Sequence, residues 1–156
     1  MIEYFADLPS DLPVVRDLFE EYGRSLGIDL AFQGFAEELA ALPGKYCPPE
    51  GSVILARSDG TPCGCVALRR FDERTCEMKR LYVRPAQRGL GIGAQLVAGI
   101  LASGVARGYE AMRLDTLSTM THAIGLYHSF GFREIEPYIF NPLPGALFME
   151  KRLQRR

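Results

Sequence analysis

From Leu81 to Gly93 the chain reads LYVRPAQRGLGIG, an apolar strand that runs into a glycine-rich turn. Glycines at positions 89, 91 and 93 let the backbone approach a ligand closely, because no Cβ atom intervenes. A helix is predicted over residues 91–107. The first N–H groups of a helix have no internal partner, and its dipole favours negative charge there. The stretch therefore predicts a cradle for a pyrophosphate, with the Arg88 cation at its rim.

Other phosphate-binding loops fit this stretch less well. The Walker pattern requires Gly-Lys-Ser or Gly-Lys-Thr, whereas Ala94 and Gln95 follow Gly93. The dinucleotide fingerprint requires the spacing G-x-G-x-x-G within a parallel βαβ unit, and the strands before this loop are predicted to be antiparallel. On the loop alone, a structural turn with packing glycines remains the alternative.

The sequence on either side of the loop alternates between strand and helix patterns. Before it we expect a strand, two helices and an antiparallel meander, at Met1–Ala6, Leu12–Leu26, Phe32–Leu42, Ser52–Arg57, Cys63–Phe71 and Thr75–Val83. After it we expect a helix, a strand, a helix and two strands, at Gly91–Arg107, Ala111–Thr116, Thr121–Phe130, Arg133–Tyr138 and Ala146–Leu153. This order favours one α/β domain over residues 1–156, with a mixed, mostly antiparallel sheet and helices on both faces.

Composition narrows the functional classes. The 156 residues are 47% hydrophobic and 24% charged, and 18 Lys and Arg face 19 Asp and Glu, for a net charge of −1. With this balance a nucleic-acid-binding protein would need a segregated basic face, and the only basic cluster is the tail: Lys151, Arg152, Arg155 and Arg156. No apolar run approaches the roughly 20 residues that span a bilayer, and the start is acidic where a signal peptide is basic. We expect a cytoplasmic protein without nucleic-acid or membrane partners.

The cysteines do not predict a metal site. The pair Cys63 and Cys65 is too closely spaced for the usual zinc ligands, and both histidines are distant in the sequence. We expect all four cysteines, Cys47 and Cys76 included, to be free reduced thiols.

A second motif gives the glycine loop a context. Arg88-x-x-Gly91-x-Gly93 is followed by Ala123-Ile124-x-Leu126-Tyr127-x-x-x-Gly131-Phe132. In this order the two resemble the GNAT family of N-acetyltransferases, whose acetyl-CoA signature is Q/R-x-x-G-x-G/A and whose second mark is L-Y-x-x-x-G-F. The strong match runs from about Glu77 to Phe132, and the remaining elements fit the family order. The resemblance implies an acetyl-CoA-dependent acyltransferase whose sheet splays between the strand ending at Val83 and the strand beginning at Ala111.

The resemblance also implies which residues hold the coenzyme. Backbone N–H groups in the loop should bind the pyrophosphate, and the strand before it should pair its backbone with the pantetheine arm. The residues concerned are Leu81, Tyr82, Val83, Arg88, Gly89, Leu90, Gly91, Ile92, Gly93 and Ala94. Many members carry an Asn where this chain has Met120. Ser118 or Thr119 is expected to cap the following helix, with Thr119 supplying a hydroxyl to the coenzyme.

Two residues are candidates for catalysis. Tyr127 lies where the family often has a tyrosine beside the coenzyme sulfur, and a phenol can protonate a leaving thiolate; the alternative is a core tyrosine. Glu77 is the candidate base, because an amine with a pKa near 10 must lose a proton before it attacks. The alternative is a glutamate paired with Lys79 or Arg80. Glu73 and Glu136 are weaker substitutes, as is a chain of waters.

The acceptor side follows from the family fold. Candidate residues are Phe32, Phe35, Tyr138, Phe140 and Asn141, which would suit an amine with an apolar body. Acidic residues that could pair with a cationic substrate are Asp29, Glu37, Glu73 and Glu136, and the alternative is that the aromatics are core and the acids surface. The proline-rich loop over residues 141–145 is expected to be rigid, and either to wall the acceptor pocket or to form a subunit contact.

We expect transfer of an acetyl group from acetyl-CoA to a primary amine of a small molecule or peptide, by direct attack in a ternary complex. Two alternatives remain open: a non-catalytic acyl-CoA-binding or sensing module, and transfer of another acyl group. Members of the family often dimerise, so a homodimer is also open.

Overall fold

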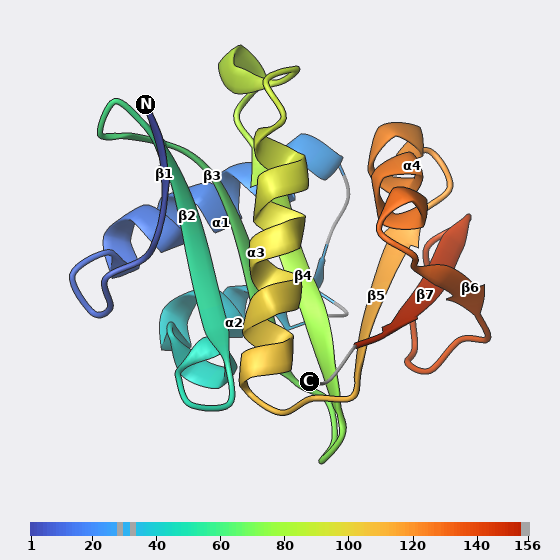
Figure 1. Ribbon diagram of the computed structural model, residues 1–156. Helices are drawn as coiled ribbons and strands as arrows, with labels where there is room; N and C mark the ends of the chain where they lie inside the picture. Colours follow the sequence, from blue (N-terminus) through green and yellow to red (C-terminus); the bar gives the residue numbers. More distant parts are fainter. Residues whose placement is uncertain (28–29, 32–33, 154–156) are drawn as a thin grey trace.

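The computed structural model describes residues 1–27, 30–31 and 34–153, and its described strands form one seven-stranded sheet in the order β1-β2-β3-β4-β5-β7-β6 (Figure 1). The strands are β1 Ile2–Tyr4, β2 Ser52–Ser58, β3 Thr61–Arg70, β4 Thr75–Val83, β5 Ala111–Leu117, β6 Arg133–Ile135 and β7 Ala146–Arg152. Neighbours pair antiparallel except β4 with β5, which are parallel. The expected mixed, mostly antiparallel sheet is confirmed.

Helices cover both faces of the sheet. They are α1 Leu12–Leu26, α2 Phe35–Ala41, α3 Ile92–Ala106 and α4 Thr121–Ser129. In Figure 1, α3 crosses in front of the central strands while α1 and α2 lie behind them. One core cluster joins α3 and α4 to the front of the sheet, and a second joins α1 and α2 to its back. The sheet is therefore the middle layer of three.

Local chemistry sets most of the element boundaries. Gly27 ends α1 in the left-handed region, with φ of 64°, where a residue without Cβ is at no disadvantage. The second helix is shorter than expected and begins at Phe35, because Gly34 precedes it with φ of 66°. The strand expected to reach Tyr138 ends at Ile135, close to Pro137, which has no N–H to donate to a ladder.

The expected side-chain cap of α4 is wrong. Met120 occupies the N-cap position, and no side chain there bonds to the helix. Ser118 instead donates its backbone N–H to the carbonyl of Gly145, at 2.8 Å. The turn before α4 is thus tied to the loop before β7 rather than to its own helix.

The sheet opens between β4 and β5, as the family resemblance implied. These strands pair only at Thr75 with Ala111, Cys76 with Met112 and Glu77 with Arg113. Beyond that point β4 continues to Val83 beside β3, and β5 continues to Leu117 beside β7. Because both strands keep their outer neighbours, the opening is a fixed feature of the sheet.

A β-bulge shifts the alternation of β4 just beyond the opening. Ala67 of β3 faces Lys79, but Cys65, two residues away, faces Tyr82, so β4 carries one extra residue. Arg80 lies at this bulge with a positive φ of 64°. The extra residue places the Lys79 and Arg80 side chains together in the lining of one cavity.

The four cysteines, all within the described residues, are free, as expected: Cys63, Cys65 and Cys76 are buried and Cys47 is exposed. Among the described helices, none combines the length and apolarity required to cross a bilayer.

Candidate active site

The start of α3 presents unused backbone donors. Gly91 is its N-cap residue, with φ of 79°, and the first bond of the helix runs from the N–H of Gln95 to the carbonyl of Gly91. Within the described part of the chain, the N–H groups of Ile92, Gly93 and Ala94 have no backbone or side-chain acceptor. These donors, at the positive end of the helix dipole, can bind an anionic group. They fit the pyrophosphate of acetyl-CoA.

The loop before α3 is anchored at its base. Arg84 donates to both carboxylate oxygens of Glu21, the closest contact being 2.6 Å, and thereby ties the end of β4 to α1. Arg88 donates from Nε to the carbonyl of Val83, at 2.9 Å. Leu90 is exposed at the tip of the loop, and Thr119 is exposed in the turn between β5 and α4.

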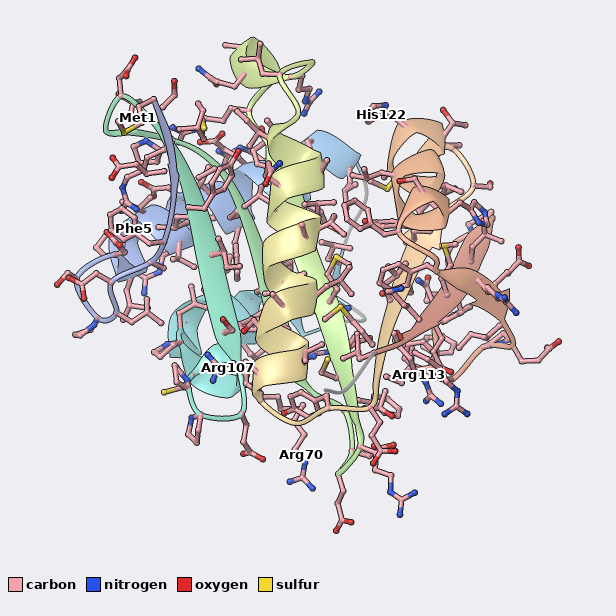
Figure 2. The ribbon with its side chains drawn as sticks, viewed as in Figure 1. Met1, Phe5, Arg70, Arg107, Arg113 and His122 are labelled. Atoms are coloured by element: carbon pink, nitrogen blue, oxygen red, sulfur yellow. The ribbon has the colours of Figure 1, made fainter. Side chains whose placement is uncertain are left out.

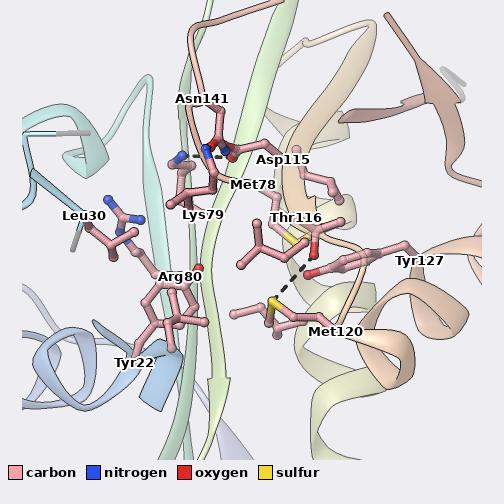
Figure 3. Close-up of a pocket in the computed structure, with 15 residues that line it drawn as sticks. Tyr22, Leu30, Met78, Lys79, Arg80, Asp115, Thr116, Met120, Tyr127 and Asn141 are labelled. Carbon is pink, nitrogen blue, oxygen red and sulfur yellow. Dashed lines mark hydrogen bonds and ion pairs between the residues drawn. The ribbon is translucent and has the colours of Figure 1, made fainter. Parts of the chain in front are cut away.

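A cavity lies where β4 and β5 diverge (Figure 3). β4 contributes Met78, Lys79, Arg80 and Leu81, and β5 contributes Leu114, Asp115, Thr116 and Leu117. The remaining lining comes from α1 and from segments near α4 and β7: Tyr22, Leu26, Leu30, Met120, Tyr127, Asn141 and Leu143. Figure 3 shows Lys79, Asp115 and Asn141 together at one end and Tyr127, Thr116 and Met120 at the other. The cavity therefore has a charged end and a phenol end.

Tyr127 reaches the cavity from α4. Its ring packs edge-on against Phe132, with the centroids 5.8 Å apart, and the side chain is buried. Burial, with smaller contributions from Tyr22 and Asp115, raises the pKa of the phenol above its ordinary value. The hydroxyl thus keeps its proton at neutral pH and can donate it.

Glu77 is held in an ion cluster behind the cavity wall. It is 2% exposed and is not among the residues that line the cavity. Its carboxylate accepts hydrogen bonds from Arg69 Nε at 3.0 Å and from the Tyr138 hydroxyl at 2.7 Å. Lys79 Nζ lies 3.8 Å away. The pairing with Lys79, which was the alternative to a base in the sequence analysis, is therefore present. It does not by itself decide whether Glu77 also acts as a base.

The charged end brings Asn141, an expected acceptor residue, together with Asp115 and Glu38, which the sequence analysis did not single out. Lys79 Nζ lies 3.3 Å from Asp115 Oδ1, and Asn141 Nδ2 donates to Asp115 Oδ2 at 3.0 Å. Arg80 makes two hydrogen bonds of 2.9 Å to Glu38 of α2, and its guanidinium lies over the Phe35 ring. Asp115 could have been predicted as a functional residue, because it is a charged residue within a short, largely apolar strand. Nothing in the sequence around Glu38 distinguishes it from a surface glutamate.

The other expected acceptor residues are scattered. Phe140 is 76% exposed and does not line the cavity, whereas Asn141 and Leu143, from the loop expected to wall the acceptor pocket, do line it. The carboxylates of Glu37, Glu73 and Glu136 are also exposed. His122 is exposed on α4, at the edge of the molecule in Figure 2. Phe32 and Asp29 lie outside the described residues, and within the described ranges no cluster of His, Cys, Asp and Glu side chains could hold a metal ion.

Comparisons with known proteins identify the family. A model of the acetyltransferase (GNAT) family matches residues 14–132. An uncharacterized N-acetyltransferase of Schizosaccharomyces pombe is 45% identical over 150 residues, 95% of this chain and 92% of the relative. A GNAT acetyltransferase structure from Staphylococcus aureus matches with a TM-score of 0.79 at 22% identity, covering 99% of this chain and 100% of the other. An N-acetyltransferase of Thermoplasma acidophilum, solved with coenzyme A, matches with a TM-score of 0.75 at 18% identity, covering 97% and 99%.

These likenesses define the molecule as an acyltransferase that depends on acetyl-CoA. The chain belongs to the GNAT family, and the resemblance read from the glycine loop and the Leu126-Tyr127 motif is confirmed.

Proposed function

We propose that this enzyme transfers the acetyl group of acetyl-CoA directly to a primary amine of a small molecule or peptide. The observation that carries the proposal is the cavity between the diverging β4 and β5, which has a phenol at one end and charged groups at the other. No cysteine is among the described residues that line it, which favours direct attack in a ternary complex over an acyl-enzyme.

The donor half of the reaction would use the main chain. Acetyl-CoA supplies a reactive thioester when bound. The N–H groups over residues 88–94 would hold its pyrophosphate, and the backbone of Leu81 and Val83 would align its pantetheine arm in the opening of the sheet. Orientation of this kind removes much of the entropic cost of bringing two substrates together.

The proton transfers would use two side chains. Tyr127, which burial keeps protonated, would donate to the leaving thiolate. Glu77 would accept the proton of the attacking amine through an intervening water, because its carboxylate lies behind the cavity wall. Tyr138, which donates to that carboxylate, would hold it in place.

Thermal unfolding and thiol release together test this function. Acetyl-CoA and CoA at about a hundredfold excess over their dissociation constants should each stabilise the fold by roughly 2.7 kcal/mol, or about 5–10 °C, whereas NAD should not. Amine-dependent release of free thiol should follow. Stabilisation without thiol release from any amine would instead identify a non-catalytic binding module, and faster turnover of propionyl-CoA than of acetyl-CoA would identify another acyl group.

A further inference from the structure

The charged end of the cavity contains a buried ammonium with spare donors. The Lys79 side chain is 3% exposed and lines the cavity. Within the described residues, Asp115 Oδ1 is the single acceptor within hydrogen-bond distance of its Nζ, and Glu77 lies farther off at 3.8 Å. An ammonium has three donors. Lys79 can therefore bind an additional anionic group inside the cavity.

The charges around this end balance. Among the residues that the structure describes, Arg69, Lys79 and Arg80 face Glu38, Glu77 and Asp115 through ion pairs of 4.0 Å or less, three cations against three anions. A net charge is costly in such a buried setting unless it is paired. A polyamine would bring uncompensated positive charge into a neutral cluster. An acceptor whose own charges cancel would not.

Lys79 and Asp115 also present opposite charges side by side. In an amino acid the ammonium and carboxylate are attached to a single carbon atom, so the two groups can face Asp115 and Lys79 together. Apolar side chains of Leu26, Leu30, Met78 and Leu143 line the same cavity and could contact an apolar side chain of the acceptor.

We infer that the acceptor is a free amino acid with an apolar side chain, whose carboxylate binds Lys79 and whose ammonium is received by Asp115. This inference rests on the proposed function and adds its substrate class. Lys79 and Asp115 thus become specificity-determining residues that choose among amines. Neither is required to hold the acetyl donor.

A matched set of acceptors tests the inference on the unmodified protein. Leucine and phenylalanine are each compared with their α-amides and with their decarboxylated amines, isoamylamine and phenethylamine, by thiol release from acetyl-CoA. Concentrations are corrected to equal free-base amine. Since a hydrogen bond to a charged group is lost without the carboxylate, kcat/KM should be roughly ten- to a hundredfold higher for the amino acids. Equal or faster turnover of the amides or amines overturns the inference.

Variants locate the effect. Lys79→Met keeps most of the length of the side chain without its charge and should narrow the preference for the carboxylate to within about threefold, mainly through KM. Arg70→Gln is the matched control, because Arg70 pairs with Glu50 at the surface and points away from the molecule in Figure 2. A preference unchanged in Lys79→Met would overturn the assignment to Lys79. If that variant does not fold, Lys79→Arg should retain the preference, and its loss would count against the assignment.

The outcomes distinguish a failure of this inference from a failure of the proposed acetyltransferase function. Thiol release with plain amines but not with amino acids overturns the inference alone. No thiol release with any acceptor overturns both. Preference for the amino acids in the unmodified protein, reduced in Lys79→Met and kept in Arg70→Gln, supports both.

Discussion

Tyr127 and Glu77 occupy opposite kinds of environment within one site. The Tyr127 ring packs against Phe132 in the core, whereas the Glu77 carboxylate accepts hydrogen bonds from a guanidinium and a phenol. Burial keeps a proton on the first group, while the second is paired with the cations Arg69 and Lys79. The two environments match a proton donor and a proton acceptor.

Tyr127→Phe isolates the proposed proton donor. The variant should fold, because the ring contact with Phe132 does not need the hydroxyl, and kcat should fall by about 10²-fold or more. The matched control is Tyr109→Phe, which removes a buried hydroxyl bonded to the carbonyl of Glu50. That control should lose about 1 kcal/mol of stability and keep its kcat. Equal kcat values for Tyr127→Phe and the unmodified protein would leave Tyr127 with a packing role only.

Glu77→Gln tests the proposed base through its pH dependence. Activity should fall roughly a hundredfold, and most clearly at lower pH, where fewer amine molecules have already lost their proton. The pH–rate profile of kcat/KM measures this, with melting temperature as the check on folding, because the change leaves the buried Lys79 and Arg69 without one anion. Glu50→Gln, at the surface, is the control. An unaltered profile would eliminate Glu77 as the base.

At the scale of elements, the two glycines at the start of α3 differ in how well they would tolerate a side chain. Gly91 has a positive φ of 79°, which a side chain tolerates poorly although nothing lies within 4 Å of an added Cβ. At Gly93 an added Cβ would make an ordinary contact of 3.7 Å with Leu126. One position is constrained by its backbone, and the other has room for a methyl group.

Gly91→Ala and Gly93→Ala should therefore change the stability of the fold in opposite directions. Gly91→Ala should destabilise the fold by about 1–2 kcal/mol, the cost of a left-handed residue with Cβ, and should reduce the melting shift produced by acetyl-CoA. Gly93→Ala should stabilise the helix by about 0.5 kcal/mol and keep that shift. Urea unfolding measures the change in stability, and thermal unfolding with and without acetyl-CoA measures the melting shift. If acetyl-CoA raised the melting temperature of Gly91→Ala as much as that of the unmodified protein, the pyrophosphate cradle would not depend on this turn.

At the scale of the whole molecule, buried acidic groups limit stability at high pH. Burial raises the pKa of the Cys76 thiol to about 12, and it raises the pKa of Cys65 and Tyr127 above their ordinary values. The unfolded chain loses these protons near the ordinary pKa of 9.0 for a thiol and 10.0 for a phenol, while the folded protein retains them. Stability from these groups is complete below pH 9 and declines above it.

The free energy of unfolding should fall, above about pH 9, by about 1.4 kcal/mol per pH unit for each such group. Urea unfolding with a reducing agent, from about pH 7 to about pH 11, measures the slope. Cys76→Ala should make this slope shallower by the contribution of one group, about 1.4 kcal/mol per pH unit. Cys47→Ser, at an exposed position, should leave the slope unchanged. A free energy that stays constant to pH 11 would contradict the prediction.

The sequence predicted what depends on local pattern. Helix and strand periodicity located β4 and α1 with their bounds, and glycines marked the turns at Gly27 and Gly91. The charged end of the cavity was beyond such reasoning, since Glu38 and Asp115 come from separate elements, and only the fold brings them to Arg80 and Lys79 on β4. The exposure of Phe140 could not be predicted either, because a loop has no regular spacing of apolar residues from which a buried face could be identified.

The bulge at Arg80 interrupts the regular alternation of side chains between the two faces of β4. Upstream of it the strand directs Glu77 and Lys79 toward the ion cluster, and downstream it directs Leu81 and Val83 toward the core beneath α3. Because the extra residue puts Lys79 and Arg80 in the lining of one cavity, its removal would restore the regular alternation of the strand, with Tyr82 still opposite Cys65 and with Leu81 and Val83 still facing the core. A one-residue deletion at this bulge should therefore cost the cavity one of its two neighbouring cations, while the strand beyond it keeps both of its faces.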